Sequence, residues 1–363
     1  TEENITSVGG SIDVQDELFL ADDTVIDTGG GDLDTREITT GTGAARQGLT
    51  LLGGGTSDVN VQGGIGAAAA PLEELLVQNA NTFEVDGAVF TFNDFDATTS
   101  GSTKLDSTVE SSNGNIILDN GGLLTLSGDV SSAGLFDQNG SGDVDLNGDI
   151  NTADSVDFAG AVDLLSDVAI DTGSGAGDVT LAEPVDGDFL LSASAGSGDV
   201  AFNGNVGSTT PLSGLDITTS GDSTFGGTVA VDDQGLSVTS DAIDFSGALT
   251  TASGGNVTLT NSGLLSTSAG ASMDSDGVFL QDGTGAVDLS DNLSTTNDDL
   301  TFQTGSLTLS DNLVLETGAG GGDIELVGTL SGGTNTLDLL AGTGDISAAN
   351  TGNIMGTVTL TGD

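Results

Sequence analysis

The chain has 363 residues, of which 36% are hydrophobic, and three cations stand against 56 carboxylates, so that the formal charge is −53. A surface of this sign repels phosphate backbones and anionic lipids, which excludes nucleic acid as a partner. The chain contains no Cys, so disulfides contribute nothing, and it has no apolar run near the roughly 20 residues that a membrane-spanning helix requires. We therefore expect no membrane insertion.

One glycine-rich motif occurs three times along the chain. Its copies are DTGGGDLDT from Asp27, DTGSGAGDVTL from Asp171 and ETGAGGGDIEL from Glu316, and they recur at nearly equal intervals. Each copy follows a short apolar pair and leads through Gly and Asp into an alternating segment, as expected for a turn that enters a strand. The recurrence predicts duplicated structural units.

Two further alignments support the same long period. NGNIILDNGGLL from Asn113 aligns without gaps with GGNVTLTNSGLL from Gly254, and Pro71 corresponds to Pro211 in a second pair of similar segments. The period is therefore about 143 residues. It predicts an incomplete preceding repeat at 1–24, repeat unit 1 at 25–168, repeat unit 2 at 169–313 and a partial repeat unit 3 at 314–363, all within one solenoid.

The segment PLEELLVQ from Pro71 has two interpretations. Pro fits a first helical turn, and Leu72, Leu75 and Leu76 would share one face of a helix. The counterpart, PLSGLDITTS from Pro211, is a poor helix former because it contains Gly, Ile and several Ser and Thr residues. We therefore predict that both segments are strands entered through Pro.

A shorter period lies inside the long one. Leu215, Leu236, Val257 and Val278 are equally spaced, and each begins a step in which two apolar residues flank one other residue. Similar steps fall between them, so inward-pointing pairs are expected about every ten residues. The chain has 59 Gly and only 3 Pro, which allows tight corners while it preserves backbone donors for strand pairing.

These features predict an all-β fold, a right-handed parallel β-helix (β-solenoid) with coils of about 21 residues. Each coil would hold two or three short strands and pair with the next coil at about 4.8 Å. The alternative is a series of tandem antiparallel β-sandwiches, which usually need about 100 residues per domain and less uniform spacing.

The segment SGDVAFNGNVGSTTPLSGLDITTSGDSTFGGTVAVDDQGLSVTS from Ser197 resembles the repetitive parts of large bacterial surface exoproteins related to filamentous haemagglutinin. The resemblance covers nearly all of the chain. It rests on the general character of the repeats and on their period, and it includes no catalytic motifs. It implies a right-handed parallel β-helix used as a stalk, adhesin or filament, located extracellularly or at the bacterial cell surface.

Catalytic chemistry is poorly represented in the composition. The chain has no His, Cys, Tyr or Trp, so a Ser-His-Asp arrangement or a thiol nucleophile is impossible. Clustered carboxylates can cleave polysaccharides on β-helical scaffolds, but here the carboxylates are spread over every coil. We expect no enzyme activity, and a polysaccharide-degrading β-helix enzyme is only a remote alternative.

The strongest metal candidate is DQNGSGDVDLNGD, from Asp137 to Asp149. Oxygen ligands at the spacing of a Ca²⁺ loop come from Asp137, Asn139, Ser141, Asp143 and Asp145. The twelfth position is Gly148 instead of an acid, and helical flanks are absent. The alternative interpretation is an Asx-rich solenoid corner. We expect no required cofactor, with Ca²⁺ as the one candidate, and we expect the acids Asp32, Asp178 and Asp323 of the repeated motif to cap turns.

The two functional hypotheses are a structural extracellular fibre or stalk segment and an adhesin that binds host, cell or matrix surfaces. No capping segment is evident in the sequence, and uncovered terminal coils would expose strand edges. We therefore expect a homo-polymer formed by head-to-tail stacking of solenoid ends, a heterologous contact that does not close. Other surface or matrix components are further candidate partners.

Overall fold

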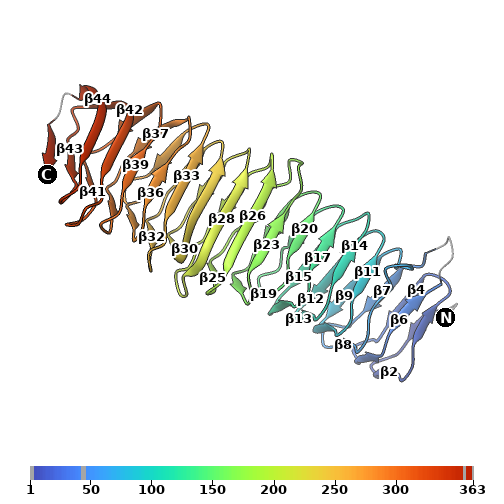
Figure 1. Cartoon of the computed structure of the whole chain (residues 1–363). Coiled ribbons are helices and arrows are strands. Elements are labelled where there is room, and N and C mark those ends of the chain that lie inside the picture. Colours follow the sequence, from blue (N-terminus) through green and yellow to red (C-terminus); the bar gives the residue numbers. More distant parts are fainter. Residues whose placement is uncertain (1–3, 42–45, 355–356, 362–363) are drawn as a thin grey trace. The chain divides into compact units, whose positions relative to one another are not determined.

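The computed structural model describes residues 4–41, 46–354 and 357–361, and the secondary structure in these residues consists of strands without helices (Figure 1). The chain divides into two compact units, Thr1–Ala182 and Glu183–Asp363. The predicted parallel β-solenoid is confirmed, with about 16 turns of about 21 residues. None of the described residues belongs to a helix long and apolar enough to cross a membrane.

In the first unit, parallel strands of successive coils form three faces. Face A contains β1 (Ile5–Thr6), β4 (Thr24–Asp27), β7 (Leu49–Leu52), β9 (Leu75–Ala80), β12 (Phe95–Thr99), β15 (Ile116–Asn120), β18 (Phe136–Gln138), β21 (Val156–Phe158) and β24 (Val179–Leu181). Face B contains β2 (Ile12–Val14), β5 (Leu33–Thr35), β8 (Asp58–Val61), β10 (Thr82–Val85), β13 (Thr103–Leu105), β16 (Leu124–Leu126), β19 (Val144–Leu146) and β22 (Val162–Leu164). Face C contains β3 (Leu18–Leu20), β6 (Ile38–Thr40), β11 (Val89–Thr91), β14 (Val109–Ser111), β17 (Val130–Ser132), β20 (Ile150–Thr152) and β23 (Val168–Asp171).

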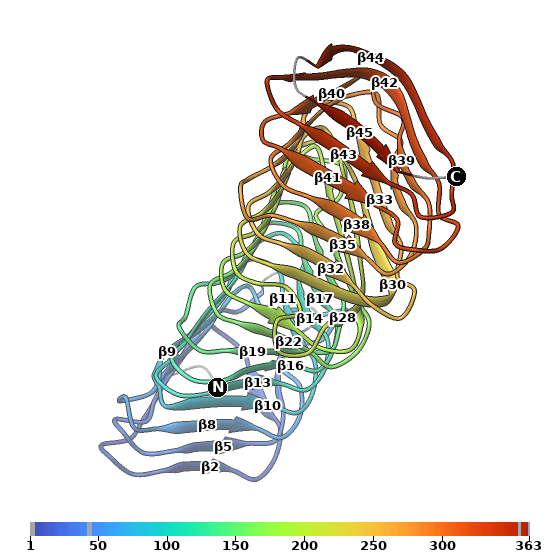
Figure 2. The same ribbon diagram turned by 90° about the vertical axis from the view of Figure 1, so that its left-hand side faces the viewer.

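The strands of the second unit also form three faces (Figure 2), which are lettered by sequence correspondence with the first unit and not by strand pairing. Face A contains β26 (Leu190–Gly196), β28 (Leu212–Thr219), β30 (Val229–Ser240), β33 (Val257–Asn261), β36 (Phe279–Gln281), β39 (Leu300–Phe302), β42 (Ile324–Gly333) and β44 (Ile346–Ile354). Face B contains β27 (Val200–Phe202), β29 (Ser223–Phe225), β31 (Ile243–Phe245), β34 (Leu265–Thr267), β37 (Ala286–Leu289) and β40 (Ser306–Leu309). Face C contains β25 (Val185–Asp186), β32 (Leu249–Thr251), β35 (Met273–Ser275), β38 (Leu293–Thr295), β41 (Leu313–Glu316), β43 (Leu337–Leu340) and β45 (Val358–Thr361).

Two long strands of the second unit turn a corner between faces. Residues 229–231 of β30 pair with β32 on face C, whereas residues 236–240 pair with β33 on face A. Similarly, β42 pairs with β39 through Ile324 and with β40 through Leu330. Gly235, with a φ of 76°, lies at the bend of β30, where a positive φ suits Gly.

Most three-residue strands bury their first and third residues and project the second outward. Equivalent positions pair in register between coils, so each face buries ladders of apolar side chains. On face B of the second unit, Phe202, Phe225 and Phe245 stack with centroid separations of 5.7 and 4.5 Å and interplanar angles of 6°. These stacked rings form part of the buried interior of this unit.

The shorter period holds over three coils and then fails. Leu215, Leu236 and Val257 pair in register, as predicted. Val257 then pairs with Phe279 instead of Val278, and Val278 is 37% exposed. The expected inward pair Val278 and Leu280 is therefore wrong, because this coil is one residue longer than the two before it and buries Phe279 together with the polar Gln281.

Both segments that follow Pro71 and Pro211 are strands, as predicted. β9 begins at Leu75 and pairs with β7 and β12, while β28 begins at Leu212. Leu72 is completely buried and forms an isolated bridge with Thr91. The helical interpretation of PLEELLVQ is thus excluded by the parallel pairing of this segment.

Candidate functional site

The predicted Ca²⁺ loop is a corner between two faces. Asp137 lies in β18 on face A and Asp145 lies in β19 on face B, and both side chains are half-buried and project outward. Asn139, Ser141 and Asp143 are exposed between the two strands. Among the described acidic residues, Asp137, Asp143 and Asp145 are not gathered within 4.8 Å of one another. Ca²⁺ binding at this corner stays a prediction.

The glycines of this corner are required by the coil that precedes them. Gly140 and Gly142 are buried against the corner of the previous coil. A Cβ on Gly142 would lie 1.7 Å from the carbonyl oxygen of Gly122, and one on Gly140 would lie 2.2 Å from the amide nitrogen of Asn120. The geometry therefore accounts for the spacing of the glycines without an ion.

Two buried amide side chains hold the same corner together. Gln138 Nε2 donates to Asn120 Oδ1 and to the carbonyl oxygen of Gly140, both at 2.8 Å. Gln138 Oε1 accepts from the backbone amides of Ala159 at 3.0 Å and Gly160 at 2.9 Å. Because buried polar groups are costly unless they are bonded, this network fixes the position of three successive coils.

The second unit repeats this arrangement at Gln281 and Asn261. Gln281 Nε2 donates to Asn261 Oδ1 at 2.8 Å and to the carbonyl oxygen of Gly283 at 3.1 Å. Both side chains are at most 1% exposed. The signal is present in the sequence, because FDQNGSGDVDL from Phe136 matches FLQDGTGAVDL from Phe279 at the long period. The metal-loop interpretation of the first segment overlooked its buried Gln.

The acids of the repeated motif make contacts between coils. Asp32 Oδ1 accepts from the backbone amide of Asp58 at 3.1 Å, and Asp323 Oδ1 accepts from that of Asp345 at 2.8 Å. These two carboxylates therefore accept from the following coil, whereas the sequence predicts that they cap turns. Asp178 donates its backbone amide to Ser155 Oγ at 3.1 Å.

The threonine of the motif closes the glycine loop. Thr172 Oγ1 donates to the carbonyl oxygen of Gly177 at 2.8 Å, and Thr317 Oγ1 donates to that of Gly322 at 2.7 Å. Thr28, in the first and shorter copy, lies 2.9 Å from Ser57 Oγ instead. All three Thr side chains are at most 1% exposed, so the hydroxyl of the motif has a structural role in the buried corner.

Acids at other corners bond the following coil in the same way. In the first unit, Asp129 Oδ1 accepts from the amide of Asp149 at 3.1 Å, and Asp149 Oδ1 in turn accepts from Ala169 at 2.8 Å. In the second unit, Asp299 Oδ1 accepts from the amide of Asp323 at 2.9 Å. Many carboxylates of this acidic chain thus bond backbone amides between coils.

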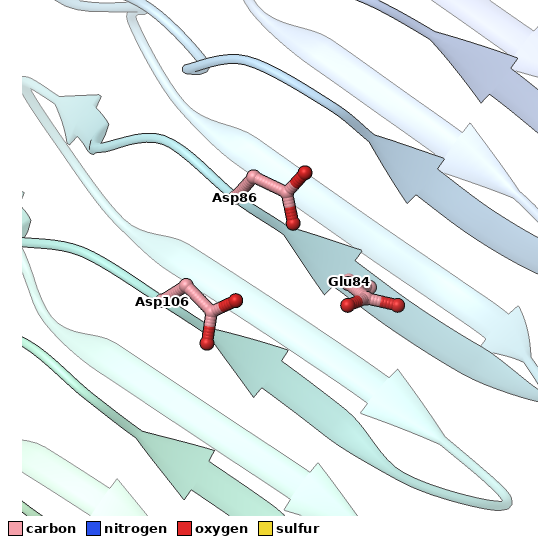
Figure 3. Close-up of side chains that lie close together, drawn as sticks. All are labelled: Glu84, Asp86 and Asp106. Carbon is pink, nitrogen blue, oxygen red and sulfur yellow. The ribbon is translucent and has the colours of Figure 1, made fainter.

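One cluster of three acids lies outside the predicted loop. Glu84 in β10, Asp86 just after it and Asp106 just after β13 have carboxylate oxygens within 4.8 Å of one another (Figure 3). Lys104 Nζ lies 2.8 Å from Glu84 Oε1 and 2.5 Å from Asp106 Oδ2. The hydrogen bonds that Lys104 donates to Asp106 and Glu84 raise its pKa above the ordinary value. The cluster therefore contains its own cation.

Lys104 occupies the middle of an outward ladder on face B. The paired residues on either side are Glu84 and Thr125, and Asp145 follows Thr125. Because these partners lie about 4.8 Å apart, a single ammonium can neutralise acids on two coils. The sequence did not indicate this cluster, since Glu84 and Lys104 are separated by one coil and their proximity follows only when the register is known.

Adjacent acids also stack on face A of the first unit. Asp137 pairs in register with Asp157. Burial raises the pKa of Asp157, a hydrogen bond from Thr180 opposes this change, and the negative charges of Asp137, Asp178 and Asp154 raise the pKa further. The folded chain therefore holds the Asp157 carboxylate in an unfavourable environment at neutral pH.

No protein-family model, curated protein or solved structure matches this chain.

Proposed function

We propose that this chain is a structural segment of an extracellular fibre or stalk at a bacterial cell surface. The observation that carries the proposal is the coil-to-coil bonding within each unit. Parallel strand pairing, buried apolar ladders and carboxylate-to-amide bonds all join one coil to the next. Repeat proteins of this type extend by adding coils without a thicker core, which suits a load-bearing element.

The acidity of the surface supports an exterior location. The chain carries 56 carboxylates and three cations, and the self-repulsion of such a surface is tolerable in a saline medium, where charges are screened over about 8–10 Å. The resemblance to haemagglutinin-like exoproteins is in keeping with the same location. The proposal includes polymerisation by head-to-tail stacking of coils, and it assigns no catalytic role.

Electron microscopy of the native material, combined with the mass of the intact chain, tests the structural role. We expect fibres or elongated particles, and a subunit near 35.5 kDa would support polymerisation of this chain itself. Compact round particles would contradict the proposal. A much larger subunit mass would replace polymerisation by a stalk within one long polypeptide.

The location is tested separately by antibody labelling of the source cells. Antibodies against the chain should label intact cells and should lose their target after brief external proteolysis. Labelling that requires cell lysis would overturn the surface assignment while leaving the structural role to the microscopy.

A further inference from the structure

A shallow groove of about 290 Å³ lies on the second unit, where the strands of face A end. Most of its exposed surface is carbon, but the residues that line it are Ser, Thr, Asp, Asn and Gly, namely Thr219, Ser220, Thr239, Ser240, Asp241, Thr260, Asn261, Ser262, Asp282, Gly283 and Thr284. These residues come from four successive coils, because Thr218 pairs with Thr239, Thr239 pairs with Thr260, and Leu259 pairs with Gln281 of the fourth coil. At about 4.8 Å per coil, the groove spans about 14 Å across the coils.

Two exposed polar rows border the groove. Thr239 and Asp282 belong to one row, with the half-buried Thr260 between them, and Asp241 and Ser262 belong to the other. The rows are linked internally, since Ser262 Oγ donates to Asp241 Oδ1 at 2.6 Å and Thr260 Oγ1 donates to Asp282 Oδ1 at 2.5 Å. Both carboxylates thus accept hydrogen bonds from hydroxyl groups, which are the groups that a polyhydroxyl ligand would offer.

The hydrogen-bonding capacity of the groove suits hydroxyl groups. A carboxylate accepts at about four lone-pair positions, and a hydroxyl both donates and accepts. Asp241 and Asp282 therefore keep acceptor capacity beyond the bonds to Ser262 and Thr260. Hydrogen bonds to a charged acceptor are stronger than neutral ones, so the two acids should contribute most of the affinity.

The charge of this region narrows the choice of ligand. Residues 183–363 contain 24 carboxylates and no Lys, Arg or His. An anionic glycan would be repelled, and a polycation would bind acids over the whole chain without preference for the groove. A peptide strand normally adds to an open sheet edge, whereas this groove is formed by side chains across strands that are already paired.

We infer that the groove binds a linear, uncharged glycan that lies across the four coils. This activity goes beyond the structural role and does not depend on it. With few polar contacts and no Trp or Tyr to stack on a sugar ring, we expect weak binding, with a Kd on the order of 0.1–10 mM for a short oligosaccharide. Repetition of the chain in a fibre would increase the effective affinity.

Calorimetric titration of the full chain with cellohexaose, laminarihexaose and mannohexaose tests the inference. Salt of about 0.5 M suppresses long-range charge effects. We expect at least one of these hexasaccharides to bind, and the D241A/D282A variant should bind it about tenfold more weakly or worse. A T239L variant, which places apolar bulk in the groove and leaves both acids in place, should also weaken binding.

The matched control is Asp119→Ala in the first unit, because Asp119 is an exposed acid at the position that corresponds to Thr260. This variant should bind like the parent, and thermal unfolding of all variants verifies that they fold. The inference is overturned if none of the three hexasaccharides binds, or if binding survives in both D241A/D282A and T239L. Equal or tighter binding of hexagalacturonate, or of deacetylated chitohexaose with equal loss in D119A, would also overturn it by assigning the interaction to another ligand class.

Discussion

The corner after β18 in the first unit and the corner after β36 in the second contain the same buried Asn and Gln, but they hold the next coil differently. In the first unit, the next coil turns tightly at Gly160 and both of its corner amides reach Gln138 Oε1. In the second unit, the segment from Phe302 to Leu307 is one residue longer than its counterpart from Phe158 to Val162. Gln281 Oε1 is buried and has no hydrogen-bond partner among the described residues.

The difference shows that a duplicated coil can keep its buried amide pair while the coil after it diverges. In the second unit, Thr304 lies in the corner that corresponds to the tight turn at Gly160. Its hydroxyl donates to the carbonyl oxygen of Gly285 at 2.5 Å. This bond holds the longer corner but leaves the Gln281 acceptor unused. The hydrogen bonding of a buried side chain in one coil therefore depends on the length of the next coil as well as on the residues of its own coil.

The two units also differ in how their charges are arranged. All three cations, Arg36, Arg46 and Lys104, lie in the first unit. On face B of the second unit, acids alternate with hydroxyl residues, and Ser266 Oγ donates to Asp244 Oδ1 at 2.6 Å. In the first unit, Lys104 neutralises part of the charge of adjacent acids on face B. In the second unit, hydroxyl residues separate the acids on face B.

The largest effect should come from the buried corner glycines, which test whether the two corners are equally tight. Gly142→Ala and Gly285→Ala each place a Cβ 1.7 Å from a backbone carbonyl oxygen. We expect each to lower the free energy of unfolding by about 3 kcal/mol or more, as measured by urea denaturation.

The controls are Gly175→Ala and Gly305→Ala, where the nearest atoms to the new Cβ lie at 3.8 and 3.9 Å. These exposed positions should change stability by less than about 0.5 kcal/mol. A mild effect of G142A or G285A would show that the coils can separate, and would contradict the close packing of the corners.

The buried glutamines should sharpen the comparison. Gln138→Met removes an acceptor from two corner amides, whereas Gln281→Met removes an acceptor that has no donor among the described residues. Both variants leave the partner Asn short of one donor, so we expect Q138M to cost about 1–2 kcal/mol more than Q281M. Equal losses in chemical denaturation would mean that Gln281 Oε1 gains a partner in solution, such as a water molecule.

A smaller effect is expected from Lys104→Gln, which removes the cation from the cluster of Glu84, Asp86 and Asp106. The loss should be about 0.5–1 kcal/mol at low salt, because the pair is partly exposed. Added salt should shrink the difference between variant and parent. A loss that is unchanged by salt would indicate that Lys104 acts by packing and not by charge.

The smallest effect should come from Asp157→Asn, which removes a charge from the stacked acids of face A. Because the pKa of Asp157 is raised in the folded chain, ionisation of this group costs stability as pH rises through that pKa. D157N should therefore be more stable than the parent at pH 7, by about 0.5 kcal/mol after allowance for partial exposure. The gain should vanish below about pH 3, where the carboxyl is protonated in both states. A gain that persists in acid would require another cause.

Much of the fold could be predicted from the sequence because apolar pairs recur at coil spacing, as in Leu215, Leu236 and Val257. The failure at Val278 has a physical cause, since one additional residue in a coil shifts the register by one and moves every side chain to the other side. A hydrophobic pattern could not identify Gln281 as an interior residue, because a buried amide depends on a partner that only the register supplies.

The candidate sites were less predictable. DQNGSGDVD has the spacing of a metal loop. However, the close approach of Gly142 to the carbonyl oxygen of Gly122 also requires a glycine at this position. The cluster around Lys104 and the groove beside Asp241 combine residues that lie about one coil apart in the sequence. Contacts of this kind follow from the exact length of each coil, which varies along the chain.

Most carboxylate-to-amide bonds between coils run in one direction, although the amides of Gly254 and Gly270 donate to Asp276 and Asp291 on the following coil. In the pairs Asp32 with Asp58, Asp129 with Asp149 and Asp299 with Asp323, the acceptor is on the earlier coil and the amide on the later one. If the chain emerges with its N-terminus first, each newly formed coil would find carboxylate acceptors on the coil that has already folded. Such a structure can grow by templating from one end, so that synthesis or export and folding proceed in the same order.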